Sequence, residues 1–387
     1  MCGNGGFDVT HEAADSTALP RRTRPTIRRV TAPVEEQTRG RLFPLRAVVL
    51  PFVVSRLIAD ALILVMAVSR PARTIVATTP LFAGFATWDG FWYVEIARNG
   101  YAQAHIPGQP SPWPFFPLLP WIIRAGHWIG PSEALVGVVV NHGAFLLGLA
   151  GLHHIARRHF DERASTLAVW AIALFPASIM FSMVYPSAIF FAGSVWAFDF
   201  VEDRRDLAAG LATLAVVMVR PNGFLVAIAL AFAVGWQWRR VAVTCGPAAI
   251  GFGAWCWYNF HRTGDALTFF KAKDGWPEIN LVDFVLRDRK IAIPHVLLAA
   301  AAALAVILVW RKLPRAWLVL TALCLVVPLF TGMVGLGRYA GETFPPFVAA
   351  GEIMRRWSRG WVLALFGASV IGMAVCAYWV VYLDYLP

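Results

Sequence analysis

One acidic side chain lies in an unusually aromatic stretch of the chain, FATWDGFWYVEIARNGY (residues 85–101). Asp89 stands between Trp88 and Trp92, so its carboxylate is expected to be partly removed from water. Such a carboxylate can act as a general base that takes a proton from a hydroxyl group. The stretch also fits a short helix at a membrane surface that Asp89 caps and Gly100 ends. The two interpretations are compatible.

Further polar side chains are predicted on the same side of the membrane as Asp89. Several are cationic, as a phosphate site requires, because arginine can bind phosphate with two hydrogen bonds and lysine adds a point charge. Fixed positive charge also stabilises a phosphate that leaves during a reaction. The residues are Tyr185, Arg220, Asn222, Lys271, Lys273, Trp276, Arg338 and Tyr339.

The chain that must hold these residues is strongly apolar. Of its 387 residues, 58% are hydrophobic and 15% are charged, whereas soluble domains carry about a quarter of charged residues. Apolar runs alternate with short arginine clusters, which predicts an all-α polytopic membrane protein with about eleven transmembrane helices. These are predicted at 43–68, 133–155, 164–182, 186–201, 207–219, 222–238, 241–259, 291–310, 316–334, 339–354 and 361–383.

The arginine clusters also predict the orientation of these helices. Clusters such as RRHFDER (157–163) and RRWSR (355–359) fall on one side, which the positive-inside rule makes cytoplasmic. Residues 1–42 are predicted to be a disordered basic cytoplasmic tail, and 43–387 a multi-pass transmembrane domain. The opposite face then receives two long outer loops, 69–132 and 260–290.

Two segments interrupt the pattern. Residues 113–129 are apolar but carry three prolines, so we expect them to be re-entrant or to lie in the interface, with a further span as the alternative. The short runs on either side of VRPNG (219–223) predict a broken helix at Pro221. Arg220 would then lie at membrane depth, where a charged group needs a partner or a watery cavity.

Composition excludes several classes of function. The formal net charge is +11, but the arginines cluster beside apolar runs, which argues against nucleic-acid binding. The five cysteines have no metal-ligand spacing. Glu95 is the one acidic residue near Asp89 in sequence and would point elsewhere on the helix, so no metal and no cofactor is expected.

Six motifs resemble, in order, those of the PIG-V-type mannosyltransferases and their bacterial relatives. The resemblance covers about residues 45–355. WDGFWYVEIARNGY and PFFPLLP (114–120) resemble the family's WDxxxYxxIAxxGY and FFPLYP. The others are FPASIMFSMVYPSAIF (175–190) for FPxSxFFxxxYSExLF, RPNGF (220–224) for RSNGxL, YNFHRTGDALTFFKAKDGW (258–276) for YxxxTGDPLAFxxAQxxW, and GRYAGETFPPF (337–347) for RYxxxxFP.

The resemblance implies a GT-C-like membrane fold whose first outer loop carries the catalytic acid. It also implies a polyprenyl-phosphate sugar donor, usually mannose, with Asp89 as the base. The loop that holds Lys271 and Trp276 would cover the donor. The motif positions near the donor phosphate are Arg220, Asn222, Arg338 and Tyr339, and the site would be lined by Trp88, Trp92, Tyr93, Tyr185 and Trp276.

One position departs from the family's pattern. The family has Tyr-Ser-Glu or Tyr-Thr-Glu where this chain has Tyr185, Pro186 and Ser187, so an acid is missing. We expect Asp265, Asp274 or Glu278 as candidates to replace it.

The sequence therefore predicts a membrane mannosyltransferase that transfers sugar with inversion to a lipid or glycan hydroxyl. The alternatives are a lipid or sugar-lipid transporter and a non-catalytic subunit. The expected location is a bacterial plasma membrane with the site on the outer face, or the endoplasmic reticulum membrane in a eukaryote.

Overall fold

The computed structural model describes residues 43–69, 82, 84–101, 105–275, 289–331 and 335–382, together with Met1, Gly3, Gly5 and Gly6. The chain divides into two units, Met1–Arg41 and Leu42–Pro387, and all helices below belong to the second. The predicted tail lies almost wholly outside the described residues, so its disorder stays a prediction. Within the described residues every regular element is a helix, which confirms the predicted all-α fold.

In the described part of the chain, four helical segments are long and apolar enough to cross a membrane. They are η1–α2 (Leu45–Ser69), α6 (Glu133–His159), α14 with η5 (Ile293–Lys312 of Arg289–Lys312) and α19 (Arg359–Tyr382). Three apolar segments are shorter, namely α9 (Asp206–Val219), α10 (Gly223–Ala233) and α15–α16 (Arg315–Phe330 of Arg315–Thr331).

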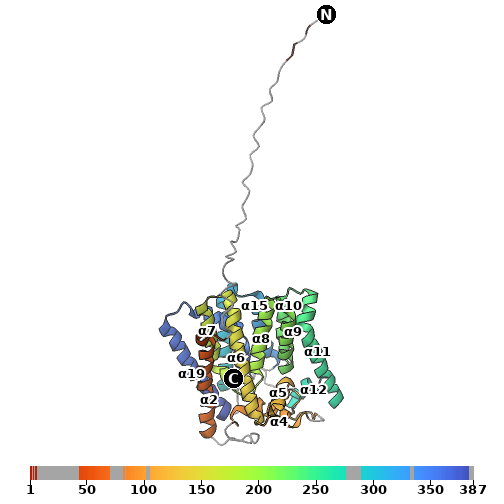
Figure 1. Ribbon diagram of the computed structural model, residues 1–387, viewed down its shortest axis with the longest axis vertical. Coiled ribbons are helices and arrows are strands. Elements are labelled where there is room, and N and C mark those ends of the chain that lie inside the picture. The colour runs from red at the N-terminus through yellow and green to blue at the C-terminus, as the bar shows by residue number, and fades with distance from the viewer. Residues whose placement is uncertain are drawn as a thin grey trace. The chain divides into compact units, whose positions relative to one another are not determined.

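The other predicted runs are helical as well, namely α7 (Glu162–Ala173), α8 (Ser187–Glu202), α11 (Trp238–Thr263), α17 (Leu336–Glu342) and α18 (Pro345–Met354). Each predicted run thus corresponds to one helix or to two consecutive ones. Helices α6, α8, α9 and α11 pack side by side in that order, and Figure 1 shows their axes running in a similar direction. This bundle is the scaffold that holds the loops connecting the ends of its helices.

The predicted run 164–182 is not one continuous helix. Helix α7 ends at Ala173, and a 3-10 turn, η3 (Pro176–Phe181), follows it. The buried guanidinium of Arg56 donates hydrogen bonds to the carbonyls of Ala173 (3.3 Å) and Ser178 (2.9 Å) and to the hydroxyl of Ser182 (2.8 Å). These bonds satisfy backbone oxygens that a broken helix leaves without partners.

The predicted break at VRPNG is confirmed. Arg220 has extended backbone angles (φ −166°, ψ 155°) between α9 and α10. Helix α10 begins at Gly223, where a Cβ atom would lie 2.5 Å from the carbonyl oxygen of Val216. Only glycine permits this close approach of the two helix ends.

Short helices fill the segment that was predicted to be the first outer loop. They are η2 (Gly84–Ala86), α4 (Asp89–Asn99) and α5 (Leu118–His127), and α5 packs against both α4 and α6. Helix α5 has ten residues, which is too few to cross a bilayer, so residues 113–129 do not form a further span. In Figure 1, α4, α5 and α12 (Thr268–Lys271) lie at one end of the bundle.

Candidate active site

Asp89 is the first residue of α4, and Trp88 is the residue that flanks this helix. Trp88 has φ 57° and ψ −127°, a strained conformation that non-glycine residues adopt mainly at functional sites. The predicted N-cap role of Asp89 is therefore wrong, since the helix start has no side-chain capping bond. Gly100 does end the helix as predicted, with φ 78° and an amide that donates to Ile96.

The carboxylate of Asp89 forms an ion pair with Arg338 of α17. Nη1 of Arg338 lies 3.1 Å from Oδ2 of Asp89, and the two side chains are 10% and 23% exposed. The Asp89 amide donates to the phenol oxygen of Tyr185 at 3.2 Å, and the Arg338 guanidinium lies 5.3 Å from the centre of the Tyr185 ring. Two residues from distant segments, Arg338 and Tyr185, thus hold Asp89 in place.

The Arg338 guanidinium has a further hydrogen-bond donor besides the one that pairs with Asp89. Its Nε atom is buried and has no hydrogen-bond partner among the described residues. A buried N–H without a partner is costly, and in a native site it commonly awaits a ligand. An anion beside this group could therefore be bound without breaking the pair with Asp89.

A second ion pair lies one helical turn further along α17. Arg220 donates through Nη1 to the carboxylate of Glu342, whose residue is 1% exposed. The hydroxyl of Ser187 donates to the other oxygen of the same carboxylate. The predicted need of Arg220 for a partner is met, and the carboxylate of Glu342 lies in contact with Ser187, the position at which the resembling family's pattern has an acid.

The ring of Tyr339 lies near both arginines. The centre of its ring lies 5.2 Å from the Arg220 guanidinium and 5.8 Å from that of Arg338. Cations at this distance are attracted by the face of an aromatic ring. Asp89, Arg338, Arg220 and Glu342 thus form a charged cluster around one ring, with a formal charge of zero.

Aromatic side chains of α4 pack against a neighbouring segment and so help to hold the helix of Asp89 in place. Tyr93 is buried, and this burial, reinforced by Asp89, raises the pKa of its phenol well above the ordinary value, which keeps it neutral. Tyr93 meets the Phe115 ring edge-on at 5.3 Å, and Trp92 stacks on Phe115 at 5.7 Å. These contacts tie the helix of Asp89 to the PFFPLLP segment.

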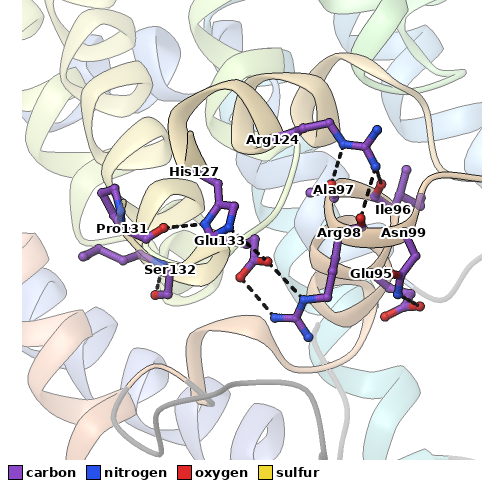
Figure 2. A network of polar contacts seen from close by, with 11 residues as sticks. Glu95, Ile96, Ala97, Arg98, Asn99, Arg124, His127, Pro131, Ser132 and Glu133 are labelled. Atoms are coloured by element: carbon purple, nitrogen blue, oxygen red, sulfur yellow. Dashed lines mark hydrogen bonds and ion pairs between the residues drawn. The ribbon is translucent and has the colours of Figure 1, made fainter. Parts of the chain in front are cut away.

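The far end of α4 is held by a polar clamp, which Figure 2 shows. Arg98 binds both oxygens of Glu133 at 3.0 and 3.1 Å, which links α4 to α6. Arg124 of α5 donates to the carbonyls of Ile96, Ala97 (2.6 Å) and Arg98. A cation is favourable at this C-terminal end of α4, because the helix dipole is negative there. We expect the clamp to fix the orientation of α4, and with it the direction in which its first residue, Asp89, points.

The remaining predicted site residues have other contacts or lie outside the described residues. Lys271 forms an ion pair with Asp265, its side chain is 63% exposed, and no contact in the described part of the chain links it to the charged cluster. Asn222 is the residue before α10, and Lys273 lies over the ring of Phe270. Trp276 lies outside the described residues.

Two of the predicted replacement acids also have other partners. Asp265 pairs with Lys271, and Asp274 lies 3.2 Å from Nε2 of His105. Glu278 lies outside the described residues. Glu342 was missed, although its place four residues after Arg338 puts both on one face of a helix and could have identified it.

Among the described residues, no three His, Cys, Asp or Glu side chains are grouped closely enough to hold a metal ion.

A solved structure of similar architecture is that of ArnT from Cupriavidus metallidurans bound to undecaprenyl phosphate, a GT-C glycosyltransferase. It has a TM-score of 0.52 and 17% sequence identity, over 84% of this chain and 62% of that one. This chain has a GT-C-like fold. As a GT-C-like protein with four long apolar helices, it is a membrane protein of many helices.

A weaker likeness, with a TM-score of 0.46 and 12% identity, is to the oligosaccharyltransferase AglB from Archaeoglobus fulgidus, solved with an inhibitory peptide and a dolichol-phosphate. It covers 84% of this chain and 55% of AglB. This chain therefore spans about three fifths of the length of ArnT and about half of AglB. No protein-family model matches the chain, and no curated protein sequence matches it either.

Proposed function

We propose that this GT-C-like protein is a glycosyltransferase that moves mannose from a polyprenyl-phosphate donor to a hydroxyl group of a lipid or glycan acceptor. The observation that carries this proposal is the ion pair between Asp89 and Arg338, at 3.1 Å and largely buried. It puts a carboxylate that can accept a proton beside a cation with a spare donor. Sugar transfer from a lipid phosphate needs both groups.

The reaction follows from the two partners of this pair. Asp89 takes the proton of the acceptor hydroxyl as the oxygen attacks the anomeric carbon of the sugar. The bond between that carbon and the phosphate oxygen breaks, and polyprenyl phosphate leaves with one more negative charge. A single displacement of this kind inverts the anomeric centre.

Charge moves within the cluster during this step. As Asp89 becomes protonated, Arg338 loses its anionic partner at the moment when the leaving phosphate gains charge. The guanidinium can then stabilise that phosphate through Nη1 and the buried Nε, while Arg220 supplies a second fixed cation. Positive charge fixed in place before the reaction is an effective way to stabilise such a transition state.

Two further observations support a lipid-linked donor. The ArnT structure of similar fold holds undecaprenyl phosphate. In this chain a groove of about 400 Å³ runs between α5, α9 and α11, with walls such as Trp121, Met218 and Trp255 that are almost wholly apolar. Helix α5, which forms one wall of the groove, also packs against α4, and the apolar walls suit a prenyl chain. The mannose itself is proposed from the motif resemblance alone.

The test is sugar transfer by the purified protein. Radiolabelled polyprenyl-phosphate mannose is incubated with the protein and a lipid extract of its host, with polyprenyl-phosphate glucose as the matched donor. We expect labelled product from the mannose donor only. Movement of the donor across a proteoliposome membrane without any product would instead favour the transporter, and donor binding without turnover would favour a non-catalytic subunit.

A further inference from the structure

The carboxylate of Glu342 has a defined task in the charged cluster. We propose that Glu342 is the positioning residue that aims Arg220 at the donor phosphate, and that it supplies from α17 the carboxylate that the chain lacks at Ser187. This inference rests on the proposed function, because it concerns the same site. The ligand it implies is a phosphate ester carried on a lipid.

The carboxylate of Glu342 is held on both sides. One oxygen accepts a hydrogen bond from Ser187 at the start of α8, and the other pairs with Arg220 at the break between α9 and α10. Glu342 is 1% exposed and Arg220 is 7% exposed. Neither charge could remain at this depth without the other. The carboxylate therefore joins three separate segments of the chain at one point.

Arg220 is confined further by aromatic rings. Its guanidinium lies 5.2 Å from the centre of the Tyr339 ring and 5.7 Å from that of Phe190. An arginine at an extended break between two helices would otherwise be free to turn. The rings and the carboxylate together restrict the orientation of its guanidinium.

Because Glu342 contacts Ser187, the carboxylate of this site could be supplied from either of two helices. The resembling family carries its acid at the position of Ser187, whereas this chain carries it at Glu342, and the two side chains are hydrogen-bonded to each other. The same carboxylate could thus reach Arg220 from either helix. Exchanging the two residues keeps the composition and charge of the site and changes only the helix that provides the acid.

The experiment compares Glu342→Ser, Glu342→Gln and the exchange variant Ser187→Glu/Glu342→Ser with wild type. Each protein is placed in nanodiscs, its thermal midpoint is measured to establish folding, and its Kd for undecaprenyl phosphate is determined. Glu95→Gln serves as the control, because Glu95 is half-buried and its side chain bonds only to Asn99 of its own helix among the described residues. Transfer kcat is measured in parallel.

We expect Glu342→Ser and Glu342→Gln to raise the Kd about tenfold or more, since an unpaired Arg220 is no longer held in place. The exchange variant should return to within about threefold of wild type, which a merely structural loss of packing would not allow. An unchanged Kd in both single variants, or a folded exchange variant no better than Glu342→Ser, would overturn the inference. So would a wild type that does not bind undecaprenyl phosphate.

The proposed function can fail separately. If wild type binds the lipid phosphate and the exchange restores that binding, but no protein transfers sugar, the proposed reaction is wrong and the role of Glu342 stands. If wild type transfers sugar and Glu342→Gln does so with the same kcat and Kd, the reaction stands and the role of Glu342 is wrong.

Discussion

Arg338 and Glu342 lie one turn apart on α17, and each forms an ion pair with a residue from a distant part of the chain. Arg338 pairs with Asp89 of α4, and Glu342 pairs with Arg220 at the break between α9 and α10. Residues four apart share one face of a helix. A helix of seven residues therefore fixes both the acid and the second cation of the candidate site.

The geometry of Arg338 predicts that lysine cannot replace it. Lysine keeps the charge but offers one ammonium group, which cannot pair with Asp89 and also present a second donor in the plane of the guanidinium. We expect Arg338→Lys to lower kcat/KM for sugar transfer by about 10- to 100-fold. Arg355→Lys is the matched control, because Arg355 pairs with Glu352 and Asp161 in one of the predicted cytoplasmic arginine clusters. Equal losses in both variants would contradict this role.

The clamp on α4 predicts an effect on activity from a residue outside the charged cluster. Arg124→Gln removes a cation that donates to three carbonyls at the end of α4. We expect a lower thermal midpoint, from a loss of about 1–3 kcal/mol, and a several-fold lower kcat because Asp89 is presented less firmly. Glu95→Gln, a variant on α4, should change neither the thermal midpoint nor kcat. An Arg124→Gln protein with wild-type kcat would show that the clamp is not needed to orient Asp89.

The buried Arg56 predicts a large loss of stability. Arg56→Met removes the guanidinium donor of the Ser178 carbonyl and one of the two side-chain donors of the Ala173 carbonyl, which should cost on the order of 3 kcal/mol. Arg46→Met is the control, because Arg46 is exposed on η1. The measurement is the thermal midpoint in detergent by intrinsic fluorescence. Similar midpoints for both variants would mean that Arg56 does not hold the break after α7.

The break before α10 predicts that Gly223 cannot be enlarged. A Cβ at this residue would lie 2.5 Å from backbone atoms of Val216 and Val217, so Gly223→Ala should destabilise the protein by about 1–3 kcal/mol. Gly253 of α11 has nothing within 4 Å of such an atom. Gly253→Ala should leave the thermal midpoint unchanged or raise it. The order of the two midpoints, compared in one detergent, tests the close approach of α9 and α10.

Much of the fold could be predicted from the sequence because it depends on periodic features. Apolar runs and arginine clusters located the helices, and Pro221 with Gly223 located the broken one. The end of α7 at Ala173 was missed, although Pro176 within the predicted run could have indicated it. Arg56, more than a hundred positions away, donates a hydrogen bond to the Ala173 carbonyl. Hydropathy alone gives no sign of such a bond.

The site was predicted by residue type more successfully than by pairing. The motifs singled out Asp89, Arg220, Arg338 and Tyr339, which the structure brings together. They gave no indication that Glu342 would contact Ser187, where the family's pattern has an acid, since this contact depends on how α8 and α17 meet. Lys271 was selected for its charge, and its local partner Asp265 lies within the same short segment.

The most direct test of the central claim is sugar transfer by Asp89→Asn, with Glu95→Gln as the control. Asparagine keeps the size of the side chain but cannot take a proton from the acceptor. With radiolabelled polyprenyl-phosphate mannose and host lipid extract, the rate for Asp89→Asn should fall by about 10²- to 10⁴-fold, while Glu95→Gln retains the wild-type rate. A folded Asp89→Asn protein that transfers sugar at the wild-type rate would contradict the assignment of Asp89 as the base.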